Sequence, residues 1–258
     1  MELKQSTLMY FSPTGSTAQV IRSMADHSAA PVSEVNLTPI QDPCRRSFDV
    51  RELLIIGVPV FGGRIPPVVK DRLAYIKGAD TPAVVVATYG NRHYDDALRE
   101  LSDFLSAKGF VTIAGAAVVT RHSIVPTIAE GRPDEGDYAA FNAFTEQVFE
   151  RIAAMEQGHP EAVTLPGNPE YKDFKGIPFK PITNMDCVAC CACVAVCPMG
   201  AIPMDSPSKT IKEKCITCMA CVWACPKNAR ALGKMDILFT KQHIGKTAKV
   251  HKNPEFFL

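Results

Sequence analysis

The sequence predicts an α/β protein in which a doubly wound parallel sheet is followed by a small cysteine-rich α+β domain. Residues 1–157 alternate apolar, strand-like segments with segments of helical periodicity. Nine of the ten cysteines lie between Cys187 and Cys225. A chain of 258 residues can form one sizeable core and a smaller module. We therefore expect a first domain over residues 1–157, a linker over 158–182, a cysteine-rich domain over 183–233 and a C-terminal tail over 234–258.

The first domain is expected to contain five strands and four helices. The strands are expected at Ser6–Phe11, Val32–Leu37, Glu52–Val58, Ala83–Thr88 and Val111–Val119. The helices are expected at Ser16–Ala29, Pro67–Lys77, Tyr94–Lys108 and Pro133–Gln157. Thr38–Val50 contains two prolines and paired arginines, so the second crossover is expected to be short or partly 3₁₀.

We expect neither a membrane-spanning protein nor an exported one. Hydrophobic residues make up 47% of the chain and charged residues 21%, and no apolar run approaches the roughly 18 residues of a transmembrane helix. The N-terminus, Met-Glu-Leu-Lys-Gln, lacks the features of a secretory signal. We expect a cytoplasmic protein, whose cysteines in a reducing compartment serve as metal ligands and not as disulfides.

The cysteines form an internal duplication. Asn184–Ile202 aligns with Lys212–Arg230 at an offset of 28 residues, and each copy contains C-x-x-C-x-x-C-x-x-x-C-P. Three closely spaced cysteines can wrap one 4Fe-4S cluster, while the fourth leads away and binds the other cluster. One predicted ligand set is Cys187, Cys190, Cys193 and Cys225, and the other is Cys215, Cys218, Cys221 and Cys197. This region resembles the two-cluster bacterial ferredoxins.

The alternative is a pair of structural zinc sites, which also use C-x-x-C pairs. Zinc modules usually separate two pairs by a longer loop, so the triplets followed by Cys-Pro favour iron-sulfur clusters. Cys191 lies outside the ligand spacing, and Cys44 is isolated in the first domain. We expect both to be packing residues, because neither has an adjacent histidine that would activate it.

The charge distribution does not indicate a nucleic-acid-binding protein. Residues 1–157 contain 15 Lys and Arg against 19 Asp and Glu, whereas residues 158–258 contain 13 against 8. Two oxidised clusters with four thiolates each would add a charge of about −4 to the basic half. No strong basic field would then remain to attract a phosphate backbone.

A second motif follows the first predicted strand and leads into the first helix. The segment Ser-Pro-Thr-Gly-Ser-Thr at residues 12–17 resembles the flavodoxin phosphate loop, S/T-x-T-G-x-T, at every fixed position. Its hydroxyls and backbone N–H groups can surround a phosphate at the positive end of a helix without a lysine. The resemblance implies FMN as cofactor. The candidate phosphate-binding residues are Ser12, Thr14, Gly15, Ser16 and Thr17.

Two further loops follow the third and fourth predicted strands, where such a fold binds the flavin ring. Their candidate ring contacts are Pro59, Val60, Phe61, Gly62, Thr88, Tyr89, Gly90, Asn91 and Tyr94. The aromatic residues could stack on the ring or be rim and core residues. Negative charge on the flavin could be stabilised by Arg64, Arg92 or His93.

From Leu8 to about Ala231, the chain resembles the flavodoxin-ferredoxin fusion proteins of anaerobic bacteria and archaea. The resemblance implies a flavodoxin-like sheet of strand order 2-1-3-4-5, one FMN and two 4Fe-4S clusters. It also implies separate redox partner proteins and sensitivity to oxygen. The short second crossover departs from long-chain flavodoxins. The five lysines of the tail Lys234–Leu258 could dock an acidic partner, but we expect its apolar residues to pack back on the domains.

Three functions are compatible with this combination. FMN exchanges one or two electrons whereas each cluster exchanges one, so the first is an electron-transfer protein between two-electron and one-electron partners. The second is an FMN-dependent reductase that acts directly on a small molecule or NAD(P)H. The third is a non-redox scaffold or sensor, in which the flavin loop would be idle.

Overall fold

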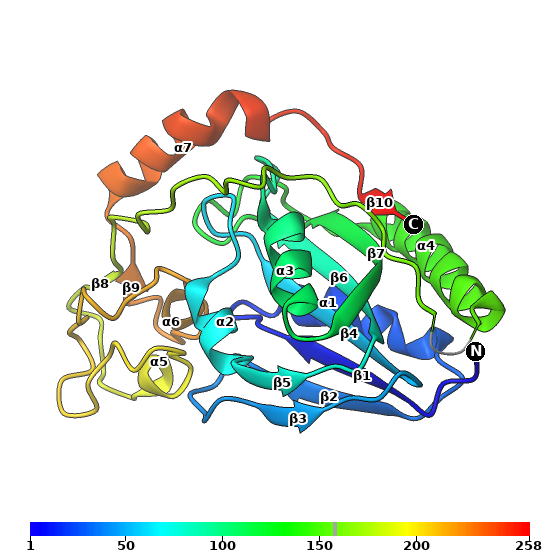
Figure 1. The fold of residues 1–258 in the computed structure, drawn as a ribbon. Helices are drawn as coiled ribbons and strands as arrows, with labels where there is room; N and C mark the ends of the chain where they lie inside the picture. Colours follow the sequence, from blue (N-terminus) through cyan, green and yellow to red (C-terminus); the bar gives the residue numbers. More distant parts are fainter. Residues whose placement is uncertain (157–158) are drawn as a thin grey trace.

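The computed structural model describes residues 1–156 and 159–258, and its largest element is a six-stranded sheet (Figure 1). Five strands of this sheet are parallel. When only these five are counted along the chain, their order across the sheet is 2-1-3-4-5, as in flavodoxins. They are β2 (Val32–Asn36), β1 (Gln5–Tyr10), β4 (Glu52–Pro59), β6 (Thr81–Tyr89) and β7 (Phe110–Val119). The predicted fold class is confirmed.

Helices cover both faces of the sheet. The central strands β4 and β6 are buried along almost their whole length, as expected of parallel strands with helices on both sides. Apolar residues of α1 (Ser16–Ser23) and α4 (Glu135–Ala154) pack on one face. Those of α2 (Pro67–Arg72) and α3 (Ala97–Ser106) pack on the other. In such a fold the ligand site lies beyond the carboxyl ends of the strands.

The helices are shorter than the sequence predicts. The first helix ends at Ser23 and continues as the 3₁₀ turn η1 (Ala25–His27), and α3 begins three residues after Tyr94. At its N-terminus, α4 has a capping box in which Asp134 and Asp137 bind each other's backbone N–H groups. The predicted end of this helix, Gln157, and the predicted boundary at residues 157–158 lie outside the described residues.

The prediction that the second helix extends to Lys77 is wrong. That helix ends at Arg72, and β5 (Tyr75–Lys77) pairs in parallel with β3 (Arg45–Ser47). The fully buried Ile76 explains the difference, since alternating exposure fits a strand with one face on the core. The second crossover is short, as predicted, but it contains the strand β3 and no 3₁₀ turn.

The segment from residue 159 to residue 181 contains no helix or strand and follows the surface of the first domain. The Val163 N–H donates to Thr112 O at 2.9 Å, and Leu165 packs against Gly115 of β7. The carboxylate of Asp96 accepts hydrogen bonds from the backbone N–H groups of Asn168 and Lys172, both at 2.8 Å. This segment is therefore held on the sheet domain by backbone hydrogen bonds.

The cysteine-rich region contains α5 (Ala192–Ala195), α6 (Ala220–Trp223) and the antiparallel pair β8 (Ile182–Thr183) and β9 (Arg230–Ala231). The chain then returns through α7 (Lys234–Ala248) to β10 (Glu255–Phe257), which pairs antiparallel with β7 (Figure 1). Phe256 stacks on Phe144 of α4 at 4.7 Å between ring centroids, so the tail packs back on the first domain as expected. Among the helices of the described residues, none combines the length and apolarity that crossing a bilayer requires.

Candidate redox centres

The two copies of the cysteine repeat have the same backbone geometry. In the first copy, Ala189, Cys191 and Gly200 have φ of 54°, 61° and 57°. The residues 28 positions later, Thr217, Met219 and Asn228, have φ of 56°, 66° and 50°. Left-handed residues cost energy when they are not glycine, so their recurrence indicates that both loops are shaped around the same kind of group.

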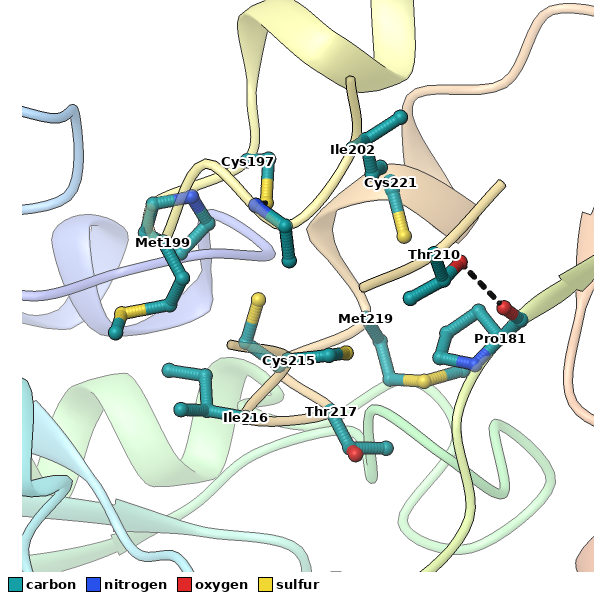
Figure 2. Close-up of a pocket in the computed structure, with 13 residues that line it drawn as sticks. Pro181, Cys197, Met199, Ile202, Thr210, Cys215, Ile216, Thr217, Met219 and Cys221 are labelled. Carbon is teal, nitrogen blue, oxygen red and sulfur yellow. Dashed lines mark hydrogen bonds between the residues drawn. The ribbon is translucent and has the colours of Figure 1, made fainter. Parts of the chain in front are cut away.

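The structure gathers the cysteines in the combination that the spacing predicts. Cys197 of the first copy lines one hollow with the triplet of the second copy, Cys215, Cys218 and Cys221. We call this the inner hollow. It encloses about 340 Å³ of space free of protein atoms, including a part open to solvent. Figure 2 shows the thiols of Cys197, Cys215 and Cys221 directed toward a common space.

A second hollow is formed in the reciprocal way. Cys225 of the second copy lines it with the triplet of the first copy, Cys187, Cys190 and Cys193. We call this the outer hollow, because Cys190 is exposed to solvent. Cys191 also lines it, and its thiol donates to Ala189 O at 3.4 Å. Cys44 packs beside the core of the first domain, where burial raises the pKa of its thiol.

The donor sets fit four-iron clusters, which are bound by four cysteine thiolates. Each hollow has the four thiols of one predicted ligand set, and a backbone N–H group donates to the fourth thiol of each set. The Ala201 N–H donates to Cys197 Sγ at 3.3 Å and the Ala229 N–H to Cys225 Sγ at 3.2 Å. Such bonds to sulfur are typical of iron-sulfur sites.

Burial keeps two thiols of the inner hollow protonated when no metal is bound. It raises the pKa of Cys218 to about 12 and that of Cys221 to about 11. A thiol binds metal as the thiolate, so a cation must replace these protons. Metal binding in the inner hollow would therefore release these protons.

A third cavity lies at the carboxyl ends of β1, β4, β6 and β7, and we call it the strand-end cavity. It encloses about 400 Å³ of space free of protein atoms, including a part open to solvent. It is lined by Pro13, Thr14, Ser16, Thr17, Pro59, Val60, Phe61, Thr88, Tyr89, Gly90, Thr120, Arg121, Ser123 and Cys218. The predicted phosphate loop and both predicted ring loops therefore contribute to one cavity.

The phosphate loop is shaped by its own hydroxyls. The Ser12 hydroxyl accepts from the Ala18 N–H at 3.0 Å, and Gly15 precedes α1 with φ of 88°. The buried Thr17 hydroxyl bonds Thr88 Oγ1 at 2.7 Å. Ser12 and Gly15 thus form the turn without lining the cavity. The hydroxyls of Thr14 and Ser16 have no partner of this kind among the described residues, so they are the ones available to a phosphate.

Several candidate ring contacts lie away from this cavity. Gly62 packs under the ring of Phe174, where an added Cβ would come within 2.5 Å of a ring carbon. The Asn91 amide donates to Ala248 O at 2.7 Å and to Val250 O at 3.0 Å. The Tyr94 hydroxyl donates to Glu255 at 2.7 Å. Gly62 is therefore covered by the linker, and Asn91 and Tyr94 form hydrogen bonds with the C-terminal tail.

The three basic residues that could stabilise negative charge on the flavin also contact other side chains. Arg64 forms a two-pronged ion pair with Glu100, with both N–O distances at 2.7 Å. Arg92 pairs with Asp95, and His93 stacks on the Tyr94 ring at 4.8 Å. None of the three lines the strand-end cavity.

Sequence reasoning missed the loop after β7. Thr120, Arg121 and Ser123 line the strand-end cavity because β7 ends at the same edge of the sheet. Their position directly after the fifth predicted strand could have identified them. The Arg121 guanidinium lies 5.1 Å from the ring centroid of Trp223 in α6, whose indole N–H donates to Ser123 O at 3.2 Å.

A buried arginine connects the phosphate loop to the cysteine-rich region. The Arg72 guanidinium donates to Thr38 O at 2.7 Å and to Pro198 O at 2.6 Å, and also to Leu37 O. The Thr38 hydroxyl in turn accepts from the Ser12 N–H at 2.7 Å. Pro198 follows Cys197 directly, so one side chain holds the first domain against a segment of the inner hollow.

Among known protein families, one matches the cysteine-rich part of the chain. The family model described as a 4Fe-4S dicluster domain matches residues 182–230. No curated protein sequence matches the chain significantly.

Solved structures resemble part of the chain at low identity. Rubredoxin oxygen:oxidoreductase from Desulfovibrio gigas is 16% identical, with a TM-score of 0.44, over 59% of this chain and 37% of its own length. A flavodoxin from the domain Archaea is 11% identical, with a TM-score of 0.42, over 58% of this chain and 99% of its own. An apo NADH:FMN oxidoreductase is 14% identical, with a TM-score of 0.45, over 65% of this chain and 97% of its own length. This chain therefore spans about a third of the length of the first of these proteins.

Proposed function

We propose that this protein transfers electrons between an FMN in the strand-end cavity and two 4Fe-4S clusters in the inner and outer hollows. The observation that carries the proposal is the position of Cys218, which lines both the strand-end cavity and the inner hollow. A flavin and a cluster bound there would share one side chain as their common wall.

Each group supplies a different chemistry when bound, since FMN exchanges one or two electrons and each cluster exchanges one. The chain's own residues would hold them. Thr14 and Ser16 would bind the phosphate at the start of α1, and Arg121 would face negative charge on the flavin. Two sets of four cysteines would ligate the clusters, in the combinations described above.

The two domains are held together by several contacts near the proposed path. Arg72 binds Pro198 O, Trp223 contacts Arg121 and Ser123, and Met199 and Ile216 pack beside the core of the first domain. These contacts support a fixed arrangement in which electrons pass within one molecule. We propose that the protein belongs with the flavodoxin-ferredoxin fusions and serves separate redox partner proteins.

The test is the cofactor content and the reaction of anaerobically purified protein. We expect one FMN and about eight iron and eight sulfide per chain, as two four-cysteine sets require. Zinc in place of iron, or no flavin, would overturn the proposal. Rapid oxidation of NAD(P)H by the protein alone would instead support the direct reductase.

A further inference from the structure

Arg230 is a buried arginine beside the outer hollow. The residue is 2% exposed, and its guanidinium Nη1 donates to Cys193 Sγ at 3.7 Å and to Pro207 O at 2.5 Å. Nη2 donates to Lys209 O at 3.2 Å and to the Thr210 hydroxyl. Arg230 lines the outer hollow, and its backbone N–H donates to Cys225 of the same ligand set. Its charge also reaches the inner set, where it partly offsets the rise that burial causes in the pKa of Cys221, but Arg230 does not line the inner hollow. Arg230 therefore contacts two ligands of the outer set, Cys193 and Cys225, and one of the inner set.

The charge of Arg230 has no counter-ion within the described residues. No Asp or Glu oxygen there lies within 4.0 Å of the guanidinium, and its Nε has no hydrogen-bond partner. A buried charge without an opposite charge is strongly destabilising. A cluster held by four thiolates carries negative charge and would supply what the protein lacks.

The internal duplication makes this arginine stand out. The two copies agree at Ala201 and Ala229, each of which donates its N–H to the fourth cysteine of its own copy. At the next residue they differ, because Ile202 in the first copy corresponds to Arg230 in the second. Ile202 is 4% exposed and packs with Cys193 and Cys221. Equivalent buried positions therefore hold an apolar group and a cation.

We infer that Arg230 raises the reduction potential of the cluster in the outer hollow relative to that of the cluster in the inner hollow. Reduction adds one electron and therefore one negative charge to a cluster. A buried cation that donates to a ligand sulfur stabilises the reduced form, since the surroundings screen it weakly. The inference rests on the proposed function, because it requires both clusters.

Two other cations lie near the inner hollow, but neither contacts a sulfur. Arg72 donates to Pro198 O, and Lys180 donates to the Thr217 hydroxyl at 3.2 Å. Their effect on the inner cluster is therefore weaker than that of a direct bond to a ligand. The resulting order of potentials gives the path a direction: from the strand-end cavity past Cys218 to the inner hollow, and then to the outer hollow with its exposed Cys190.

The test is an anaerobic titration with dithionite, in which EPR spectroscopy follows each cluster as it takes up one electron. In the unmodified protein, the first electron should appear on the outer cluster, identified by the change of its signal in Cys187→Ser. In Arg230→Gln, the ratio of reduced outer to reduced inner cluster should fall about tenfold, equivalent to about 59 mV for a one-electron couple.

Two further variants separate charge from packing. Arg230→Lys keeps the charge and should restore most of the ratio. Lys227→Met removes an exposed cation that lines the same hollow, and it should change the ratio less than about twofold because water and salt screen that charge.

The inference is overturned if the first electron appears on the inner cluster of the unmodified protein. It is also overturned if Arg230→Gln leaves the ratio unchanged, or if Arg230→Lys or Lys227→Met changes it as much as Arg230→Gln does. The position of the first electron is measured in the unmodified protein, so this readout does not depend on whether an Arg230 variant folds. Absence of clusters from the unmodified protein would instead contradict the proposed function.

Discussion

The hollows of the cysteine-rich region and the strand-end cavity are built in different ways. All eight cysteines of the two predicted ligand sets lie between Cys187 and Cys225, in loops whose left-handed residues recur at the same offset. The walls of the strand-end cavity come from four strand ends, and Cys218 of the other domain completes them. A local repeat thus defines its own site, whereas the proposed flavin site depends on how distant segments of two domains pack together.

The largest expected effect is on the cluster proposed for the inner hollow. Cys197→Ala should remove the inner cluster and about half of the iron while leaving the outer cluster, because Cys197 belongs spatially to the triplet of the second copy. Iron analysis and EPR spectra compared with Cys187→Ala and Cys215→Ala measure this. Cys191→Ala is the matched control and should keep both clusters. The reciprocal arrangement is refuted if the Cys197 variant has the spectrum of the Cys187 variant.

The second prediction concerns the contact between the domains. Arg72→Met removes hydrogen bonds from a buried guanidinium to three carbonyl oxygens, so we expect the free energy of unfolding to fall by about 2 to 3 kcal/mol. Electron transfer from flavin to clusters should slow about tenfold or more, with all cofactors retained.

Denaturant unfolding and flash photolysis provide the two measurements for Arg72→Met. Arg45→Met, which removes an exposed arginine that lies 4.0 Å from the Tyr75 ring, should change neither quantity much. Loss of stability without any slowing would mean that Arg72 supports the fold but not the redox contact.

The third prediction concerns the phosphate loop. Thr14→Val should weaken FMN binding by about 1 to 3 kcal/mol, since its hydroxyl is available to the phosphate. Thr17→Val should instead lower stability, because it breaks the buried bond to Thr88. Isothermal titration of the apoprotein with FMN measures the affinity. Ser23→Ala on the same helix should leave the affinity unchanged, and an unchanged affinity in Thr14→Val would contradict the assignment of the loop.

The smallest effect is expected at Trp223. Trp223→Leu removes the cation–π contact to Arg121 and the hydrogen bond to Ser123, and should weaken FMN binding by about 0.5 to 1 kcal/mol. The iron content should stay constant, because Trp223 is not a ligand in either predicted set. A variant that binds FMN as tightly as the unmodified protein would show that the cysteine-rich domain does not shape the flavin site.

The same contrast explains what the sequence could predict. The pairing of Cys197 with the second triplet follows from spacing alone, because nothing distant takes part. The α/β class also follows from alternating apolar and helical segments, and the order of the five parallel strands is implied by the resemblance to flavodoxins. Asn91 and Tyr94 could not be assigned in this way, since their partners belong to the C-terminal tail more than 150 residues away. Pairing of β10 with β7 is a long-range contact of the same kind.

The central claim is that flavin and clusters exchange electrons within one chain, and laser-flash reduction of the FMN tests it most directly. The rate at which the clusters are then reduced should be followed over about a hundredfold range of protein concentration. The shared Cys218 wall and the Arg72 contact predict a first-order rate constant that is identical at every concentration. A rate that rises in proportion to concentration would contradict the account, because electrons would then pass between molecules.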